Sequence, residues 1–92
     1  MTYLDRIIRR ARAGTLESSD VFVTLEPHEG GLEIQIDSVV KEQYGHAILC
    51  AVEDVLKEQQ ITSARVTVVD RGALDCVIRA RVETAALRGK GE

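Results

Sequence analysis

The strongest constraint on the fold is a long amphipathic segment in the middle of the chain, between residues 39 and 59. At about 100° per residue, its apolar side chains fall on one broad face and its charged side chains fall on the opposite arc. The apolar face holds Val40, Tyr44, Ala47, Ile48, Ala51, Val52 and Val55. The pattern predicts one long helix over 39–59, with Ser38 as its N-cap. Such a helix needs a second layer to cover its apolar face.

A pair of strands is predicted before this helix. Val21, Val23 and Leu25 share one face of residues 20–25, and residues 32–37 alternate cleanly between apolar and polar side chains, which is typical of strands with one buried face. The intervening residues 26–31 have the composition of a hairpin loop, so we expect the two strands to pair. His28 lies in that loop with two glutamates near it, but it lacks the partners that a metal site needs, and we interpret it as an exposed loop residue.

A second pair of strands is predicted after the helix, over 64–69 and 74–82, with a connecting turn at 70–73. Gly72 in that turn can take a positive φ. The alternation over 74–82 predicts that Cys76 points into the core.

A short basic helix is predicted near the N-terminus, over 3–13, with Thr2 as its N-cap and Gly14 as its terminator in the left-handed conformation. Its apolar stripe consists of Leu4, Ile7, Ile8 and Ala11. Its other face carries Arg6, Arg9, Arg10 and Arg12. Two interpretations stay open: the arginines form a solvated face, or they bind phosphate.

These elements predict the α+β class, as a single small domain over 1–92. The order is α-ββ-α-ββ, with a four-stranded, mainly antiparallel sheet covered by one long amphipathic helix. The strand order is left open. Residues 1–13 form the N-terminal helix, 84–88 add a helical turn, and 89–92 form a loose tail.

Composition narrows the class of protein further. Apolar residues make up 45% of the chain, but the aromatic residues are limited to Tyr3, Phe22 and Tyr44, so the core must be aliphatic. A formal charge of −3 provides no overall attraction to nucleic acid or to an anionic membrane. No apolar run is long enough to span a bilayer, and arginines interrupt any signal-peptide block. We therefore expect a cytoplasmic protein.

The two cysteines, Cys50 and Cys76, are isolated thiols with no CxxC spacing, and we expect no disulfide. His46 precedes Cys50 by four residues on the predicted helix, which could bind a metal or activate the thiol, but two groups without a third ligand make a poor site. The chain has no Ser-His-Asp order, glycine-rich phosphate loop or zinc pattern. We expect no catalysis by this chain alone.

One stretch stands out before the first strand: Gly14-Thr15-Leu16-Glu17-Ser18-Ser19-Asp20. It places two adjacent serines between two carboxylates in a segment with no reason to be buried. Taken by itself it indicates a turn, because Ser and Asp side chains satisfy local backbone groups. A second turn-like stretch, Asp70-Arg71-Gly72-Ala73-Leu74-Asp75-Cys76, follows far down the chain.

Together with Gln43-Tyr44-Gly45 and Arg79-Ala80-Arg81, these stretches resemble the acyl carrier (gamma) subunit of bacterial citrate lyase. The resemblance extends from about residue 13 to 88, and residues 1–12 depart from it by being more helical in pattern and more basic. The resemblance implies that Ser18 carries a covalent prosthetic group, 2′-(5″-phosphoribosyl)-3′-dephospho-coenzyme A, joined through a phosphodiester.

The same resemblance implies partners. A separate transferase would attach the group, the alpha subunit would exchange acetyl for citryl on its thiol, and the beta subunit would cleave citryl to oxaloacetate. The phosphates of the group would be near Arg9, Arg10 and Arg12, which we take as candidate phosphate contacts. Two alternatives stay open: a small interaction or regulatory module, and the carrier subunit of a related malonate decarboxylase-type complex.

Overall fold

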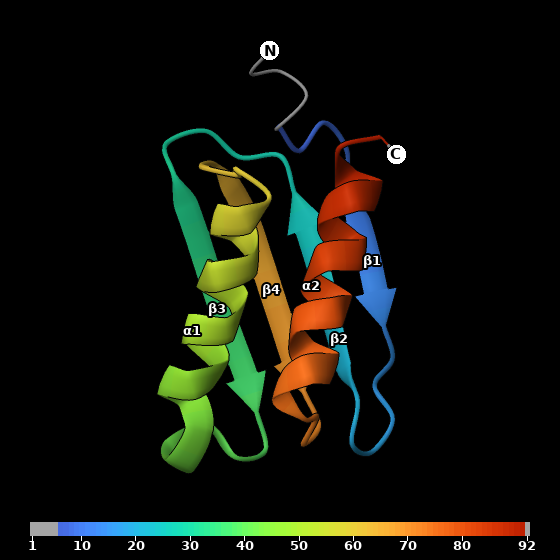
Figure 1. The fold of residues 1–92 in the computed structure, drawn as a ribbon, viewed down its shortest axis with the longest axis vertical. Helices are drawn as coiled ribbons and strands as arrows, with labels where there is room; N and C mark the ends of the chain where they lie inside the picture. Colours follow the sequence, from blue (N-terminus) through green and yellow to red (C-terminus); the bar gives the residue numbers. More distant parts are fainter. Residues whose placement is uncertain (1–5, 92) are drawn as a thin grey trace.

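A computed structural model describes residues 6–91, which form a four-stranded sheet with two helices packed on one of its faces. The elements are β1 Ala11–Gly14, β2 Val21–Glu26, β3 Leu32–Ser38, α1 Lys41–Glu58, β4 Ala64–Asp70 and α2 Asp75–Gly89. Figure 1 shows α1 lying over β3 and α2 lying over β1 and β2. The loops after β1, β3 and β4 all lie at the same end of the molecule.

The sheet has the order β1-β2-β4-β3. β1 pairs with β2, and β2 pairs with β4, in antiparallel fashion, whereas β3 and β4 are parallel and are joined by the crossover helix α1. Val68 of β4 lies opposite Val23 on one side and Ile36 on the other. The predicted α+β class and four-stranded, mainly antiparallel sheet are therefore confirmed, since two of the three pairings are antiparallel.

The predicted hairpin of 20–25 with 32–37 is wrong, although both segments are strands. β4 lies between them, and its buried residues Ala64, Val66 and Val68 have no exposed surface. A β-branched run with strands on both sides and a helical layer above it is typical of a central strand. The other inner position belongs to β2, whose Val21, Val23 and Leu25 are also fully buried.

The predicted strand over 74–82 is also wrong, because this segment begins helix α2. Its buried residues are Ile78, Val82, Ala85, Ala86 and Gly89. Spacings of three and four place these residues on one helical face, and they continue well past residue 82. Cys76 is consequently exposed on α2, and the prediction that it points into the core is wrong.

The predicted N-terminal helix is wrong wherever the structure describes it. Residues 1–5, including Thr2, lie outside the described residues; residues 6–10 are not helical, and the segment from Ala11 is strand β1. Ala11 and Ala13 face α2, and a Cβ atom added at Gly89 would lie 3.0 Å from Ile7 Cδ1. The close approach of these small residues stabilises the segment as an edge strand, whereas a helix of about eleven residues has little stability by itself.

The central helix is confirmed over Lys41–Glu58, with a different cap from the predicted one. Val40 occupies the N-cap position, and the Ser38 hydroxyl, two residues earlier, accepts a hydrogen bond from the Val40 N–H (3.0 Å). The buried side chains of α1 are Ile48, Ala51, Val52, Val55 and Leu56. Tyr44 and Ala47 belong to the same helical face, but they lie in the first two turns of α1, before the buried part of the helix begins at Ile48, and both are exposed.

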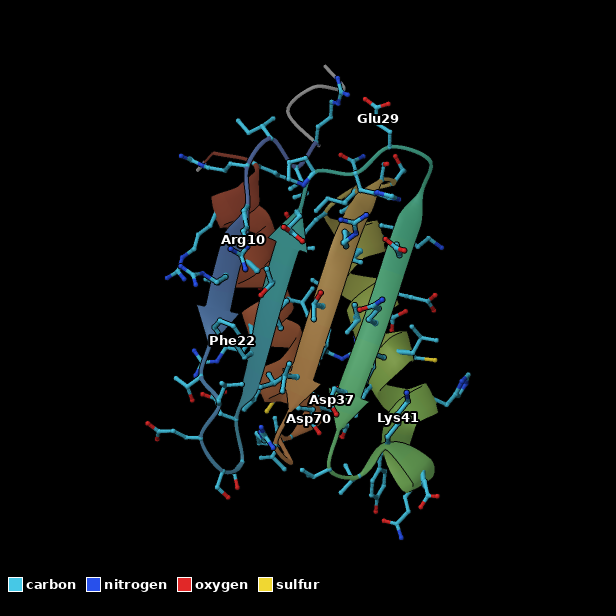
Figure 2. The ribbon with its side chains drawn as sticks, turned by 180° about the vertical axis from the view of Figure 1, so that it is seen from behind. Arg10, Phe22, Glu29, Asp37, Lys41 and Asp70 are labelled. Carbon is cyan, nitrogen blue, oxygen red and sulfur yellow. The ribbon has the colours of Figure 1, made fainter. Side chains whose placement is uncertain are left out.

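The core between the sheet and the helices is aliphatic, as predicted, and consists of Ile, Leu, Val and Ala side chains. The other face of the sheet carries no helix in the described residues (Figure 2). Its polar side chains include Arg65, which forms an ion pair with Glu33 (2.7 Å), and Arg10, which lies 3.8 Å from Glu26. An antiparallel sheet with one solvated face is common. Within 6–91, no helix is long and apolar enough to cross a membrane.

Candidate functional site

Ser18 lies in the loop that joins β1 to β2, at the end of the molecule where α1 and α2 begin. Its side chain is exposed, and its hydroxyl has no hydrogen-bond partner among residues 6–91. A serine in this position can be reached from solvent by a large partner. The loop begins at Gly14, whose φ of +96° confirms the predicted positive value at that residue, although the glycine ends a strand and not a helix.

Asp20 anchors the far side of this loop through a two-point ion pair with Arg81 of α2. Arg81 Nε donates to Asp20 Oδ1 (3.1 Å), and Arg81 Nη2 donates to Asp20 Oδ2 (3.0 Å). The same carboxylate accepts hydrogen bonds from the Thr15 hydroxyl (2.7 Å) and the Val21 N–H (2.7 Å). Asp20 therefore joins both ends of the loop to the second helix.

These contacts favour the ionised form of Asp20. The hydrogen bonds from Thr15, Arg81 and Val21, in that order of size, lower the pKa of the Asp20 carboxyl from its usual 3.8 to about 2. The side chain of Asp20 is 15% exposed and that of Arg81 is 40% exposed, so the pair is only partly shielded from solvent. At neutral pH the loop is held by a charged, fully hydrogen-bonded carboxylate.

Ser19 differs from Ser18 because its backbone is fixed. The Ser19 N–H donates to the Arg71 carbonyl (2.8 Å), and the Arg71 N–H donates to the Asp20 carbonyl (2.9 Å). Ser19 has a φ of +66°, in the left-handed region. This reciprocal pair of hydrogen bonds brings the Gly14–Asp20 stretch directly against the Asp70–Cys76 stretch, the two segments that the sequence singled out.

Asp70, at the end of β4, is a buried carboxylate that accepts hydrogen bonds from the neighbouring loops. It is 1% exposed; the Ser38 hydroxyl donates to its Oδ2 (2.7 Å), and the Ala73 N–H donates to its Oδ1 (2.9 Å). Figure 2 shows Asp70 at the end of the sheet from which the β3–α1 and β4–α2 connections leave. Its contacts make it a structural residue and not a group available for acid–base chemistry.

A groove opens between the first turns of α1 and α2, on the other side of the β4–α2 loop from the Ser18 loop. It has a volume of about 320 Å³ and is lined mainly by apolar side chains of Val40, Tyr44, Ala47, Ile48, Leu74 and Ile78. Of the six exposed large apolar side chains within 6–91, four lie at this end of the molecule: Leu16, Val39, Tyr44 and Leu74. We call this groove the α1/α2 groove.

The arginines predicted to contact phosphate lie in the edge strand β1 and in the residues just before it. Arg9, Arg10 and Arg12 line a shallow depression together with Arg88. Arg9 Nε donates to the Arg88 carbonyl (3.1 Å), and Arg88 Nη1 donates to the Arg12 carbonyl (2.8 Å). Arg12 is two strand residues, or about 7 Å, from Gly14, whereas Arg10 lies toward the opposite end of β1 (Figure 2).

The remaining candidates carry little chemistry. Cys50 Sγ lies 3.6 Å from His46 Nε2 on the surface of α1, as the helical spacing predicted, and both cysteines are free thiols. Within the described part of the chain, no three His, Cys, Asp or Glu side chains are grouped to hold a metal ion. His28 lies in the loop between β2 and β3.

Sequence reasoning found the exposed serine but missed its anchors. Arg81 was placed on a strand, and Arg71 contributes only its backbone, which no residue pattern marks. A signal did exist in the pairing of the two stretches themselves, because two distant polar turns that recur together in one family are expected to lie together in space. The geometry gives an exposed serine, without a hydrogen-bond partner among residues 6–91, on a loop that is fixed at its far end.

Comparisons with known proteins match the chain over most of its length. A family model described as "Malonate decarboxylase delta subunit (MdcD)", an acyl carrier family, matches residues 8–89. The citrate lyase acyl carrier protein of Latilactobacillus sakei is 50% identical over 82 residues, which cover 89% of this chain and 81% of that protein. The citrate lyase acyl carrier protein of Vibrio cholerae serotype O1 is 52% identical over 84 residues, covering 90% of this chain and 86% of that protein.

Among solved structures, the fold is similar to a chain in the crystal structure of a Pseudomonas malonate decarboxylase hetero-tetramer in complex with malonate. The TM-score is 0.78 and the sequence identity is 27%, with 90% of this chain and 86% of that chain covered. The similarity therefore extends over most of the two-layer fold.

Proposed function

Because the chain belongs to the family of citrate lyase acyl carrier proteins, we propose that Ser18 is the residue to which its prosthetic group is covalently attached. The observation that carries this proposal is the contrast between the two serines. Both hydroxyls are exposed and without a hydrogen-bond partner within 6–91, but the backbone of Ser19 is tied to Arg71 through its N–H. The difference between the two serines therefore lies in the backbone, and it supports Ser18, at the untied tip of the loop, as the attachment site.

The group proposed is 2′-(5″-phosphoribosyl)-3′-dephospho-coenzyme A, in phosphodiester linkage. A serine hydroxyl is a weak nucleophile at neutral pH, so a separate transferase has to supply the base that takes its proton. As the Ser18 oxygen–phosphorus bond forms, the bond from phosphorus to the leaving group of the incoming phosphate ester breaks. The fixed far end of the loop would present Ser18 to the transferase in a constant position, while Gly14 and the exposed tip leave room for it.

When bound, the group supplies a thiol that carries acyl groups as thioesters. This chain would then act as a tethered carrier. We propose that its partners are the alpha subunit, which exchanges acetyl for citryl, and the beta subunit, which releases oxaloacetate and regenerates acetyl. Tethering raises the concentration of the acyl group at each partner site to roughly millimolar without any new contact. Neither Cys50 nor Cys76 has a part in this scheme.

The test of the attachment site uses the purified chain and its transferase, with intact mass as the measurement. Ser18→Ala should give no mass increase after incubation with the transferase and the precursor. Ser19→Ala is the matched control and should load at a rate close to that of the unmodified chain. Loading of the Ser18→Ala protein would contradict the assignment, and circular dichroism of both variants would verify that they are folded.

We also propose that Arg9, Arg10 and Arg12 contact the phosphates of the group or of its precursor. In support, these three arginines line one depression together with Arg88, and guanidinium binds phosphate through two hydrogen bonds. Because Arg12 is about 7 Å from Gly14 along the strand, the phosphates would have to lie along β1 for Arg9 and Arg10 to take part.

Replacement of all three arginines by glutamine tests this part of the proposal. We expect loading to slow at low salt and the difference from the unmodified chain to shrink as salt rises, because exposed charge contacts are screened. Equal loading rates at every salt concentration would mean that the arginines serve only as a solvated edge. An edge strand with charged side chains also resists pairing with other chains, which is the competing explanation for their presence.

A carrier for malonate decarboxylase is the second candidate, supported by the family model and by the similar solved structure. The identity to that structure is 27%, against 50% and 52% for the citrate lyase carriers named above. Reconstitution separates the two. The loaded chain should restore citrate cleavage to citrate lyase alpha and beta subunits and should fail to support malonate decarboxylation by the corresponding enzyme.

A further inference from the structure

The α1/α2 groove lies at the Ser18 end of the molecule and is lined mainly by apolar side chains. Its walls are Tyr44, Ala47 and Ile48 on α1 and Leu74 and Ile78 on the α2 side. Tyr44 and Leu74 at its rim are 56% and 70% exposed. Large apolar side chains that are exposed around a concave surface are typical of a binding site and not of a plain solvent face.

The groove is close to Ser18 through a short, defined path. The Ser19 N–H lies 2.8 Å from the Arg71 carbonyl, and Ala73 in the groove wall is two residues after Arg71. Standard backbone lengths then limit the separation of the Ser18 and Ala73 Cα atoms to about 15 Å. A pantetheine chain is longer than this span, so anything attached to Ser18 by such a chain can enter the groove without any movement of the fold.

Charge restricts which part of an attached group could enter. The charged residues that line the groove are Asp70 and Asp75, and no arginine or lysine within 6–91 lines it. Asp70 is hydrogen-bonded to Ser38 and Ala73, and Asp75 forms an ion pair with Arg79. These carboxylates disfavour phosphate. The exposed Asp75 can accept a hydrogen bond from an amide N–H group, whereas the buried Asp70 is engaged within the fold. The groove therefore suits a neutral, partly apolar chain with amides, and the arginines on β1 suit phosphates.

From this geometry we infer that the α1/α2 groove is the resting site for the neutral, thiol-bearing end of the group carried on Ser18 of the same chain. The inference rests on the proposed function, because it needs a group attached to Ser18. The acyl thioester would lie against Ile48 and Ile78 between visits to the partner subunits and would be withdrawn from water. Its volume, about 320 Å³, is within the usual range for a small-molecule site.

Methyl NMR on the whole chain provides the first test, with loading at Ser18 established beforehand by intact mass. On loading, the methyl resonances of Ile48 and Ile78 should shift, and those of Ile61 should not, because Ile61 lies at the other end of α1. Ala47→Leu fills the groove from an exposed helix position and should abolish the shifts at Ile78. Ala80→Leu, on an exposed face of α2 outside the groove, is the matched control.

Thiol reactivity provides the second test, in a chain carrying Cys50→Ser and Cys76→Ser so that only the attached thiol reacts. A neutral disulfide reagent should modify this thiol about threefold or more slowly than it modifies free pantetheine, in proportion to the time spent in the groove. Ala47→Leu should restore the faster rate, and Ala80→Leu should not.

The outcomes separate the two proposals. A chain that does not load at Ser18 overturns the proposed function and this inference with it. A chain that loads, but shows no shift at Ile48 or Ile78 and reacts as fast as free pantetheine, overturns the inference and leaves the proposed function standing. Shifts that persist in Ala47→Leu would place the group elsewhere and would equally overturn the inference.

Discussion

The ion pair between Asp20 and Arg81 leads to a quantitative prediction about stability and pH. The change is Asp20→Asn, which keeps the shape of the side chain and removes its charge. The pKa of Asp20 is lowered from 3.8 to about 2 in the folded chain. A lowering of that size corresponds to about 2 kcal/mol of folding free energy at neutral pH. Because Arg81 is 40% exposed, solvent screening reduces this to about 1–2 kcal/mol.

The sign of the pH dependence follows from the direction of the pKa change. The folded pKa lies below the unfolded one, so the unfolded chain binds more protons between pH 3.8 and about 2. The stabilisation by Asp20 is thus complete above this window and is lost as the pH falls through it. An asparagine side chain at this position cannot titrate, so the variant should be less stable than the unmodified chain at neutral pH and should approach it in stability near pH 2.

Urea unfolding at a series of pH values from neutral to about 2.5, followed by circular dichroism, measures the difference directly. The midpoint gap between the two chains should shrink across the acid window at similar m-values. Asp37→Asn, at an exposed position on β3, is the matched control and should change the midpoint little at any pH. A gap for Asp20→Asn that stays constant from neutral pH to about 2.5 would refute the reasoning. An Arg81→Met chain should lose only part of the acid-sensitive stability, because Thr15 and Val21 still donate hydrogen bonds to the Asp20 carboxylate.

Two further predictions concern the loop and the thiols. Gly14→Ala should lower the free energy of unfolding by at least about 2 kcal/mol, because φ is +96° and the new Cβ atom would lie 1.8 Å from the Val21 carbonyl oxygen. Gly72→Ala, with φ of +90° and open space around it, should show only the smaller cost of the backbone conformation. Urea unfolding of both variants measures the difference. Cys50→Ser and Cys76→Ser should each leave citrate cleavage by the reconstituted complex unchanged, and complete loss of activity in a folded, loaded variant would return those thiols to the mechanism.

The elements that sequence periodicity predicted correctly are those whose pattern has one interpretation. The segment from Lys41 to Glu58 is too long to be a strand, and its apolar face is continuous. Residues 32–38 and 64–70 alternate cleanly or form a β-branched run, and both are strands. The class of the fold and the size of the sheet follow from these segments because a helix of this length must cover several strands.

The errors occurred where two periods coincide or where the partner is distant in sequence. Residues 78 and 82 are buried in α2, but they also belong to an alternating series over 74–82, and only the later buried residues, Ala85, Ala86 and Gly89, decide for a helix. β4 pairs with both β2 and β3, and this pairing depends on how deeply each strand is buried. The alternation of residues within one strand carries no information on that depth. Likewise, Ser18 could be proposed from its motif, whereas the link from its loop to Arg81, 61 residues beyond Asp20, became visible only in the fold.

The position of β4 between β2 and β3 has a consequence for the order in which the chain can assemble. During synthesis, β2 and β3 leave the ribosome first, but each lacks its main neighbour until residues 64–70 follow. Arg71 and Arg81, which hold the Ser18 loop, are made later still. The sheet can therefore close only when most of the 92 residues have been made. A transferase that requires the anchored loop would modify finished chains and pass over nascent or truncated ones.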